Sequence, residues 1–329
     1  MMPRETMTVI FRATAAVAIS LLWAPLAALA QAYPVKPVRI IVVWPPGGSN
    51  DVVARVMAQR LTETVGQPFV VENRAGATGT IGSEIVAKSP PDGYTVMVQS
   101  ATHIANAHTY KKLPYDTMKD FTGVLPLAVQ VGMLVVHPSL PVKSVKELIA
   151  LAKARPDEIA WASTGTGSYT WLTMALFLQM SGTKMLEVNY KGGGPAVIAL
   201  LSGETQVFFV GIGSVHAALK AKRLRPLGVA SDKRLKPYPD VPTVAEAGLP
   251  GYELTAWIGS FVPSATPRPI VERLNTEFKK ALEHPDVTRI LGAQALDPMP
   301  MTPDEFARRL KSDYEKYERI IRTTGARAQ

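Results

Sequence analysis

Two segments rich in glycine and hydroxyl residues are the parts of this sequence whose residue types could hold a small molecule. WPPGGSND (Trp44–Asp51) and STGTGS (Ser163–Ser168) each stand between a predicted strand and a predicted helix. Glycines let a ligand approach the backbone closely, and the unpaired N–H groups at a helix start attract an anion such as a carboxylate. Ser49 or Asp51 is also placed to cap the helix after the first segment. Either segment alone is more typical of an ordinary capped turn, so the pair carries the prediction.

The common arrangements of catalytic and metal-binding side chains are missing from the sequence. There is no G-x-S-x-G nucleophile elbow, no H-E-x-x-H pair, no P-loop and no G-x-G-x-x-G fingerprint. Cysteine is absent, which excludes disulfides, zinc–thiolate sites and a thiol nucleophile. His103 and His108 lie five residues apart in a predicted loop and lack metal-ligand spacing. We expect no catalytic residue, no metal and no organic cofactor, although an enzyme assembled from distant residues stays an alternative.

The first thirty residues follow the order of a secretory signal peptide. Arg4 and Arg12 give a positive start, Ala13–Ala30 is almost wholly apolar, and Ala28-Leu29-Ala30 is a small-x-small cleavage pattern before Gln31. The alternative is a membrane anchor, but a spanning helix needs about 20 apolar residues. We therefore expect cleavage after Ala30 and a location in the periplasm.

Composition indicates a globular protein with room for two domains. The chain has 329 residues, of which 47% are hydrophobic and 19% charged. Its net charge of +9 is spread along the sequence without a basic run, so no nucleic-acid partner is expected. A diffuse positive field would favour anionic solutes, and it would equally serve solubility.

From about residue 33 onward, short apolar strands alternate with helical patterns. This order predicts doubly wound, mainly parallel sheets, whose ligands bind where strand carboxyl ends meet helix starts. Ser144 with Glu147 is a predicted capping box, Thr302 a predicted cap, and Gly192–Pro195 a predicted turn. The expected strands are Val38–Val43, Phe69–Val71, Tyr94–Val98, Met133–Val136, Ile159–Ala162, Met185–Val188, Gln206–Val210 and Leu227–Ala230, with Tyr252–Phe261 extended. The expected helices are Asp51–Thr64, Ile81–Ala87, Ser144–Ala154, one from the Ser163–Gly167 loop to about Met180, Ala196–Leu201, Val215–Ala221, Ile270–Glu283 and Pro303–Thr324.

Around these loops the sequence resembles the Bug family, the periplasmic binding proteins of tripartite tricarboxylate transporters. The likeness runs in unbroken order from Tyr33 to the C-terminus. The segments that carry it are Trp44–Arg55, Gln67–Gly82, Pro91–Val96, Leu113–Phe121, Ala162–Ser168, Asn189–Ala196, Val241–Glu253 and Trp257.

The resemblance implies an α/β, type II periplasmic-binding-protein fold, with two doubly wound α/β domains joined by two crossing strands. After a signal peptide over 1–30, domain 1 would be residues 31–131 plus 255–329 and domain 2 residues 132–254. Such a receptor captures a small carboxylate (a dicarboxylic, amino or aromatic acid) between the domains and, as a monomer, delivers it to membrane transporter subunits. An exported enzyme on the same scaffold and a ligand sensor for a signalling receptor are the alternatives. The binding residues implied are Pro46, Gly47, Gly48, Ser49, Gly76 and Ala77 from domain 1, and Ser163, Thr164, Thr166, Gly167, Ser168, Tyr169 and Tyr190 from domain 2.

Three residues near the second loop depart from the family's pattern. Trp171 stands where the family often has histidine, Tyr169 is bulky, and Asn189 replaces a frequent proline before Tyr190. Tyr169 and Trp171 could stack on an aromatic acid or pack within a buried helix. The identity of the bound acid is therefore not carried over from any relative.

Overall fold

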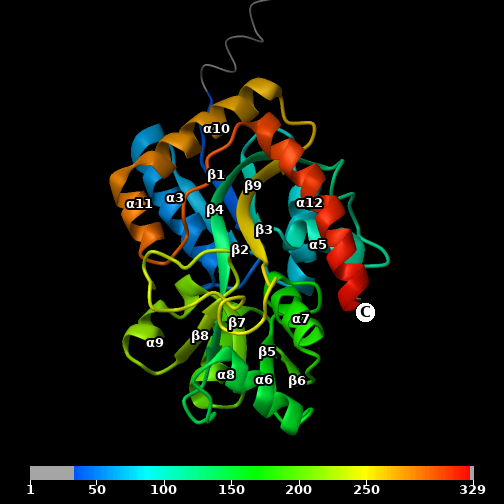
Figure 1. The fold of residues 1–329 in the computed structure, drawn as a ribbon. Helices are drawn as coiled ribbons and strands as arrows, with labels where there is room; N and C mark the ends of the chain where they lie inside the picture. Colours follow the sequence, from blue (N-terminus) through cyan, green and yellow to red (C-terminus); the bar gives the residue numbers. More distant parts are fainter. Residues whose placement is uncertain (1–32, 327–329) are drawn as a thin grey trace, which may run out of the picture.

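One long strand runs through both halves of the molecule, and a second strand pairs with it in the first half. In the computed structural model, which describes residues 33–326, β4 (Phe121–Val136) and β9 (Thr255–Pro263) pair antiparallel from Phe121 opposite Pro263 to Val131 opposite Thr255. β4 then continues into a second sheet, where it pairs with β7 and β8. Two lobes therefore lie end to end along these strands (Figure 1). The expected signal peptide over 1–30 lies outside the described residues.

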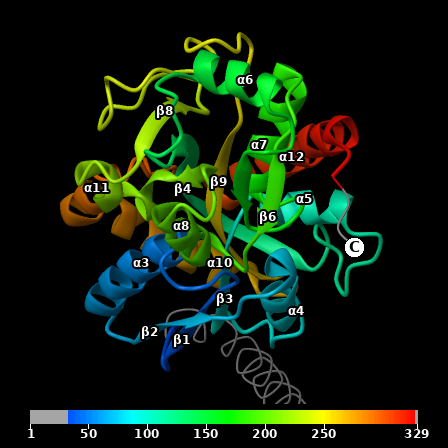
Figure 2. The same cartoon turned by 90° about the horizontal axis from the view of Figure 1, so that it is seen from below.

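The first lobe is a sheet covered by helices on both faces. Its strand order is β2-β1-β3-β9-β4, with β1 parallel to both of its neighbours. α3, α10 and α11 cover one face, and α4, α5 and α12 the other, as two perpendicular views show (Figures 1 and 2). The bounds are β1 Val38–Val42, β2 Phe69–Asn73, β3 Thr95–Ser100, α3 Ser49–Val65, α4 Thr80–Ala87, α5 Thr102–Thr109, α10 Arg268–Glu283, α11 Pro285–Gly292 and α12 Pro303–Thr324, with a short 3-10 turn η1 at Ala77–Gly79.

The second lobe repeats this plan with smaller elements. Its strands follow the order β8-β4-β7-β5-β6, and β5 runs parallel to both β6 and β7. α6 and α7 cover one face, and α8 and α9 the other. The bounds are β5 Ala160–Ser163, β6 Leu186–Asn189, β7 Val207–Gly211, β8 Arg225–Val229, α6 Val145–Ala154, α7 Tyr169–Ser181, α8 Gly193–Ser202 and α9 His216–Lys220, with a 3-10 turn η2 at Ile212–Ser214.

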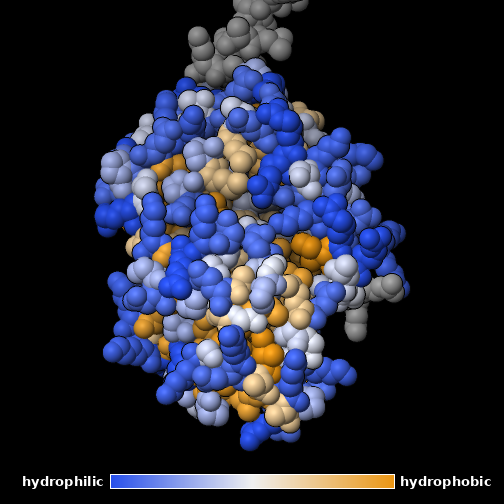
Figure 3. Space-filling model, in the orientation of Figure 1, coloured by the Kyte–Doolittle hydropathy of each residue, from blue (hydrophilic) through white to orange (hydrophobic). Residues whose placement is uncertain are grey.

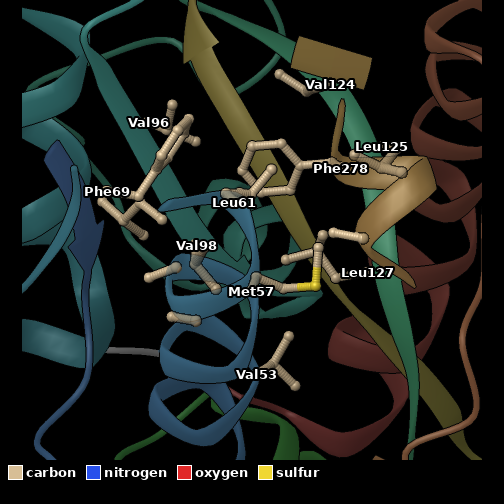
Figure 4. Packing of buried hydrophobic residues seen from close by; sticks show 14 of the residues in the cluster. Val53, Met57, Leu61, Phe69, Val96, Val98, Val124, Leu125, Leu127 and Phe278 are labelled. Carbon is tan, nitrogen blue, oxygen red and sulfur yellow. The ribbon is translucent and has the colours of Figure 1, made fainter. Parts of the chain in front are cut away.

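Helix α3 shows how the apolar spacing of the sequence builds the core. Val53, Met57 and Leu61 recur every four residues and belong to one buried cluster with Phe278 of α10, beside whose ring Leu61 lies (Figure 4). Full burial of each such side chain contributes about 1.5–3 kcal/mol. This packing fixes the start of α3 at the edge of the sheet that faces the other lobe.

The structure confirms most of the predicted elements and corrects some. The predicted Met133–Val136 strand is only the end of β4. The earlier part of β4 was not predicted, because it contains Pro126, which lies beside a shift in the pairing register with β9. α8 begins at Gly193 rather than Ala196, since a proline in the first turn needs no N–H donor. Helix α11 was not predicted.

The helix caps agree well with the sequence. Thr302 and Glu305 form the complete capping box of α12. Ser144 accepts a hydrogen bond from the Glu147 N–H as predicted, but the Glu147 carboxylate binds the N–H of Lys143 instead of that of Ser144.

The segment with two histidines is helix α5, not the loop that was predicted. Nearly every residue of α5 is buried, so the apolar spacing that reveals a surface helix is absent. His103 is 1% exposed and packs against Phe121 and Phe261. Burial lowers the pKa of His103 to about 3.

This buried imidazole predicts loss of stability in mild acid. The unfolded chain takes up a proton as pH falls through about 6.5 while the folded protein does not, so the free energy of unfolding is highest above 6.5 and falls by about 1.4 kcal/mol per pH unit below it. Urea unfolding at pH 7 and pH 5 measures the change. Between pH 7 and pH 5, we expect the free energy of unfolding to fall by about 2 kcal/mol more in the wild type than in His103→Phe. Equal losses in the two proteins would contradict the assignment.

In the part of the chain that the structure describes, no helix has the length and apolar character needed to cross a membrane. The face shown in Figure 3 is mainly hydrophilic, with apolar side chains gathered over the second lobe and beside the boundary between the lobes.

Candidate functional site

Four helices begin at one small chamber between the lobes. Residues from the starts of α3, α5, α7 and α8 line a cavity of about 50 Å³, which we call the inner chamber. No side chain caps the N-terminus of α3 or α8. The free N–H groups and the positive ends of these helices therefore favour an anion. The lining residues are Trp44, Pro45, Gly48, Ser49, Asn50, Ser100, Thr102, Gln130, Thr164, Ser168, Tyr169, Thr170, Gly193, Val210, Gly211 and Ser214.

Neutral polar groups make up the polar part of this lining. Among the described residues that line the inner chamber, none is charged. Asn50 and Gln130 are more than nine-tenths buried, and their amide oxygens have no partner within the described chain. Because a buried polar group without a partner costs about 1–3 kcal/mol, these two amides indicate that a ligand or water completes the site.

Three hydroxyls form a triangle at the start of α7. Thr164 Oγ1 lies 2.9 Å from Ser168 Oγ and 2.7 Å from Thr170 Oγ1, and the last two atoms are 3.2 Å apart. Ser168 also caps α7 by accepting a hydrogen bond from the Trp171 N–H. These bonds hold the hydroxyls in place at the chamber wall, where each can turn to donate to an oxygen atom.

The carboxylate of Asp51 fixes the first loop and is not a wall of the chamber. It accepts hydrogen bonds from the Gly47 N–H, Arg55 and Asn73. Burial alone would raise the pKa of Asp51, but these bonds outweigh burial and lower it. The expected cap at Ser49 or Asp51 is wrong, because the helix begins one residue after Gly48, which has no side chain to offer.

A wider space of about 1020 Å³, the outer chamber, continues from the inner one. Trp44, Pro45 and Thr164 line both. Lys191 is the one charged residue among the described residues that line either chamber. Tyr190 lies in the wall with its hydroxyl 2.7 Å from Glu204 Oε1, and burial together with this bond raises the pKa of Tyr190 to about 12. The other lining residues are Ala75, Gly76, Ala77, Thr78, Tyr110, Gly165, Thr166 and Asn189.

The lobes touch each other around the chambers. The Tyr169 N–H donates to Thr102 Oγ1 of the first lobe at 3.1 Å. A Cβ atom at Gly167 would lie 2.5 Å from Thr109 Cγ2, and one at Gly165 would lie 2.8 Å from Thr78 Oγ1. The Ser163–Ser168 loop thus lies directly against α5 and η1 only because its glycines carry no side chains.

The structure brings nine of the thirteen predicted site residues to the chamber walls. The other four support the loops instead: Pro46 and Gly47 are exposed beside the first loop, Ser163 Oγ accepts the Gly165 N–H, and Gly167 faces Thr109. Contact of any of them with a ligand stays a prediction. The nine in the walls are Gly48, Ser49, Gly76, Ala77, Thr164, Thr166, Ser168, Tyr169 and Tyr190.

The two aromatic residues at the start of α7 are held by the protein itself. Tyr169 is 3% exposed, and its hydroxyl bonds to Gly132 and Leu254. Trp171 lies outside both chamber linings and donates its indole N–H to Glu187. Their arrangement favours packing over stacking on an aromatic ligand.

Several lining residues were not found from the sequence. Thr102 lies just after the carboxyl end of β3, at the start of α5. Positions of this kind identified the two loops in the sequence, but Thr102 was missed because α5 was not predicted. Gln130 lies inside β4, and nothing in its sequence context marks it.

A family profile, "Tripartite tricarboxylate transporter family receptor", matches residues 53–326. The chain belongs to this family. BugT of Bordetella pertussis is 36% identical over 97% of this chain and 96% of its own length. A Pseudomonas sp. (strain P51) protein, named for the tcbD-tcbE intergenic region, is 37% identical over 88% of this chain and 87% of its own length.

Solved structures of relatives have the same fold. The R. palustris protein Rpa4515, determined with adipate, has a TM-score of 0.87 at 35% identity and covers 90% of this chain and 99% of its own. MatC from Rhodopseudomonas palustris, with bound malate, has a TM-score of 0.84 at 32% identity, covering 88% and 100%. The periplasmic binding protein BugD has a TM-score of 0.87 at 27% identity, covering 90% and 100%. The receptor therefore has the type II periplasmic-binding fold that its sequence predicted.

Proposed function

We propose that this receptor holds one carboxylate group of a small organic acid in the inner chamber and releases the acid unchanged to membrane transporter subunits. The convergence of four helix starts on an uncharged, hydroxyl-lined cavity supports this best. Binding of adipate and malate by relatives at 35% and 32% identity agrees with it. The receptor would work as a monomer in the periplasm, with lobe boundaries at 131/132 and 254/255 on the crossing strands.

A thermal-shift screen tests the proposal. Adipate, malate and hexanoate are compared with 1,6-hexanediol, which has adipate's length without its charge. A ligand at 100 times its Kd adds about 2.7 kcal/mol to the free energy of unfolding. Stabilisation by at least one acid and none by the diol is expected, and mass spectrometry should recover the acid unchanged. A response to the diol alone, or conversion of the acid, would reject the proposal.

The single cation of the outer chamber should discriminate between acids with one and two carboxylates. Lys191 can meet a second carboxylate that extends out of the inner chamber. Lys191→Gln should weaken adipate binding by up to about 5-fold, since exposed ion pairs contribute about 0.2–1 kcal/mol. Hexanoate binding should not change. Calorimetric titration measures both, with Lys279→Gln on the exposed face of α10 as the control. Equal effects of Lys191→Gln on the two acids would show that Lys191 does not meet a second carboxylate.

We expect the first thirty residues to be removed during export, so that the mature chain begins at Gln31. The apolar run followed by Ala28-Leu29-Ala30 supports this site. Intact-mass measurement of the protein from periplasmic and membrane fractions decides it. A product that keeps its first residues and sediments with membranes would contradict both the cleavage and the location.

A further inference from the structure

The two crossing segments separate at one residue pair, and the gap between them is filled. Val131 and Thr255 are the last partners of β4 and β9, so Gly132 and Leu254 would be the next pair in register. They do not pair. The Tyr169 hydroxyl lies between them, accepting the Gly132 N–H at 2.8 Å and donating to the Leu254 carbonyl at 2.9 Å.

The backbone of Ala230 fills the other side of the same gap. The Ala230 N–H donates to the Gly132 carbonyl at 2.8 Å, and the Ala230 carbonyl accepts the Leu254 N–H at 2.9 Å. All four backbone groups of the split pair are therefore satisfied, two by a backbone residue and two by one phenol hydroxyl. Because these groups are buried, leaving any without a partner would be costly.

Tyr169 is also the first residue of α7 and part of the inner chamber wall. Its own N–H bonds Thr102 of the opposite lobe. One residue thus touches the chamber, the facing lobe and both crossing segments. Burial raises the pKa of Tyr169, so the hydroxyl keeps the proton that it donates to Leu254.

We propose that Tyr169 is a positioning residue that couples the inner chamber to the hinge: its hydroxyl holds the crossing segments apart at Gly132 and Leu254 in the geometry that brings the lobes together. Without it, the Gly132 N–H and the Leu254 carbonyl lose their partner in the closed arrangement. They can regain hydrogen bonds only by pairing directly or by admitting water, and both change the angle between the lobes. The coupling to ligand rests on the proposed function, whereas the geometry of the hinge does not.

Tyr169→Phe tests this against a closely matched control. Tyr252 is also a buried tyrosine, and its hydroxyl donates to the Thr173 carbonyl of the same helix without touching the crossing segments. Tyr252→Phe therefore removes the same atom from the same neighbourhood. Both variants should lose stability to urea, so stability alone does not separate a structural role from a hinge role.

Three readouts separate the two roles. In the ligand-free protein, the Gly132 amide should exchange its hydrogen faster in Tyr169→Phe than in the wild type, and the radius of gyration from small-angle scattering should rise. Affinity for whichever of adipate and malate the wild type binds more tightly should fall about 10-fold, because a smaller closed fraction raises the apparent Kd. Tyr252→Phe should match the wild type in all three.

Identical exchange, radius and affinity in the two variants would overturn the role of Tyr169. A wild type that binds neither acid would count against the proposed function instead, and the exchange and scattering measurements would still decide the hinge role.

Discussion

Gly167→Ala is expected to weaken carboxylate binding by about 10- to 150-fold while the protein stays folded. A methyl group there would lie 2.5 Å from Thr109 Cγ2 and 3.0 Å from Thr109 Cβ, across the boundary between the lobes. The Cβ of Thr109 is fixed to α5, so the two lobes must move apart. Overpacking of this kind costs about 1–3 kcal/mol, and a cost of about 1.4–3 kcal/mol weakens binding about 10- to 150-fold. Calorimetric titration with the acid found by screening is the measurement.

The control for this variant is Gly66→Ala. Gly167 and Gly66 have φ values of +80° and +77°, so alanine is strained at both by about 1–2 kcal/mol. Gly66 ends α3 on the surface and has no neighbouring atom within 4 Å of the added methyl. Equal loss of affinity in the two variants would mean that strain is responsible and the contact between the lobes is not. Wild-type affinity in Gly167→Ala would contradict the importance of that contact.

The sequence was sufficient where an element is built from local signals. The spacing of Val53, Met57 and Leu61 predicted α3, and Thr302 predicted the start of α12, because both patterns act within one or two turns. The rule that ligands meet strand ends and helix starts also placed Ser168 and Ser49, which both line the inner chamber.

What the sequence could not show depends on contacts between distant segments. Gln130 faces the chamber because β4 passes from one sheet to the other there, and a residue within a strand carries no local sign of that. His103 lies in a helix that is buried on almost every side, so its pattern is not amphipathic. The role of Tyr169 depends on Gly132 and Leu254, which are far from it in sequence and come together only through the sheet register.

The sequence pointed to the whole Ser163–Ser168 loop, and the structure divides it into two environments. Ser168 and Thr164 line the inner chamber together with Thr170, the second residue of α7, whereas Thr166 lines only the outer chamber. A carboxylate in the inner chamber would therefore contact the triangle of hydroxyls rather than Thr166. This difference between two threonines gives the second prediction.

Thr170→Val should lower the affinity for a monocarboxylate such as hexanoate by about 10- to 150-fold, because a hydrogen bond to a charged group contributes about 1.5–3 kcal/mol. Valine keeps the shape of threonine but removes Oγ1, which lies 2.7 Å from Thr164 Oγ1. Thr166→Val should change hexanoate affinity much less. Thr276→Val on α10 controls for the loss of a helical hydroxyl, since Thr276 Oγ1 donates to the Glu272 carbonyl of the same helix, away from both chambers. Titration of the three variants places the carboxylate. If Thr170→Val binds hexanoate as tightly as the wild type while Thr166→Val does not, the carboxylate lies in the outer chamber, and the four helix starts hold something else.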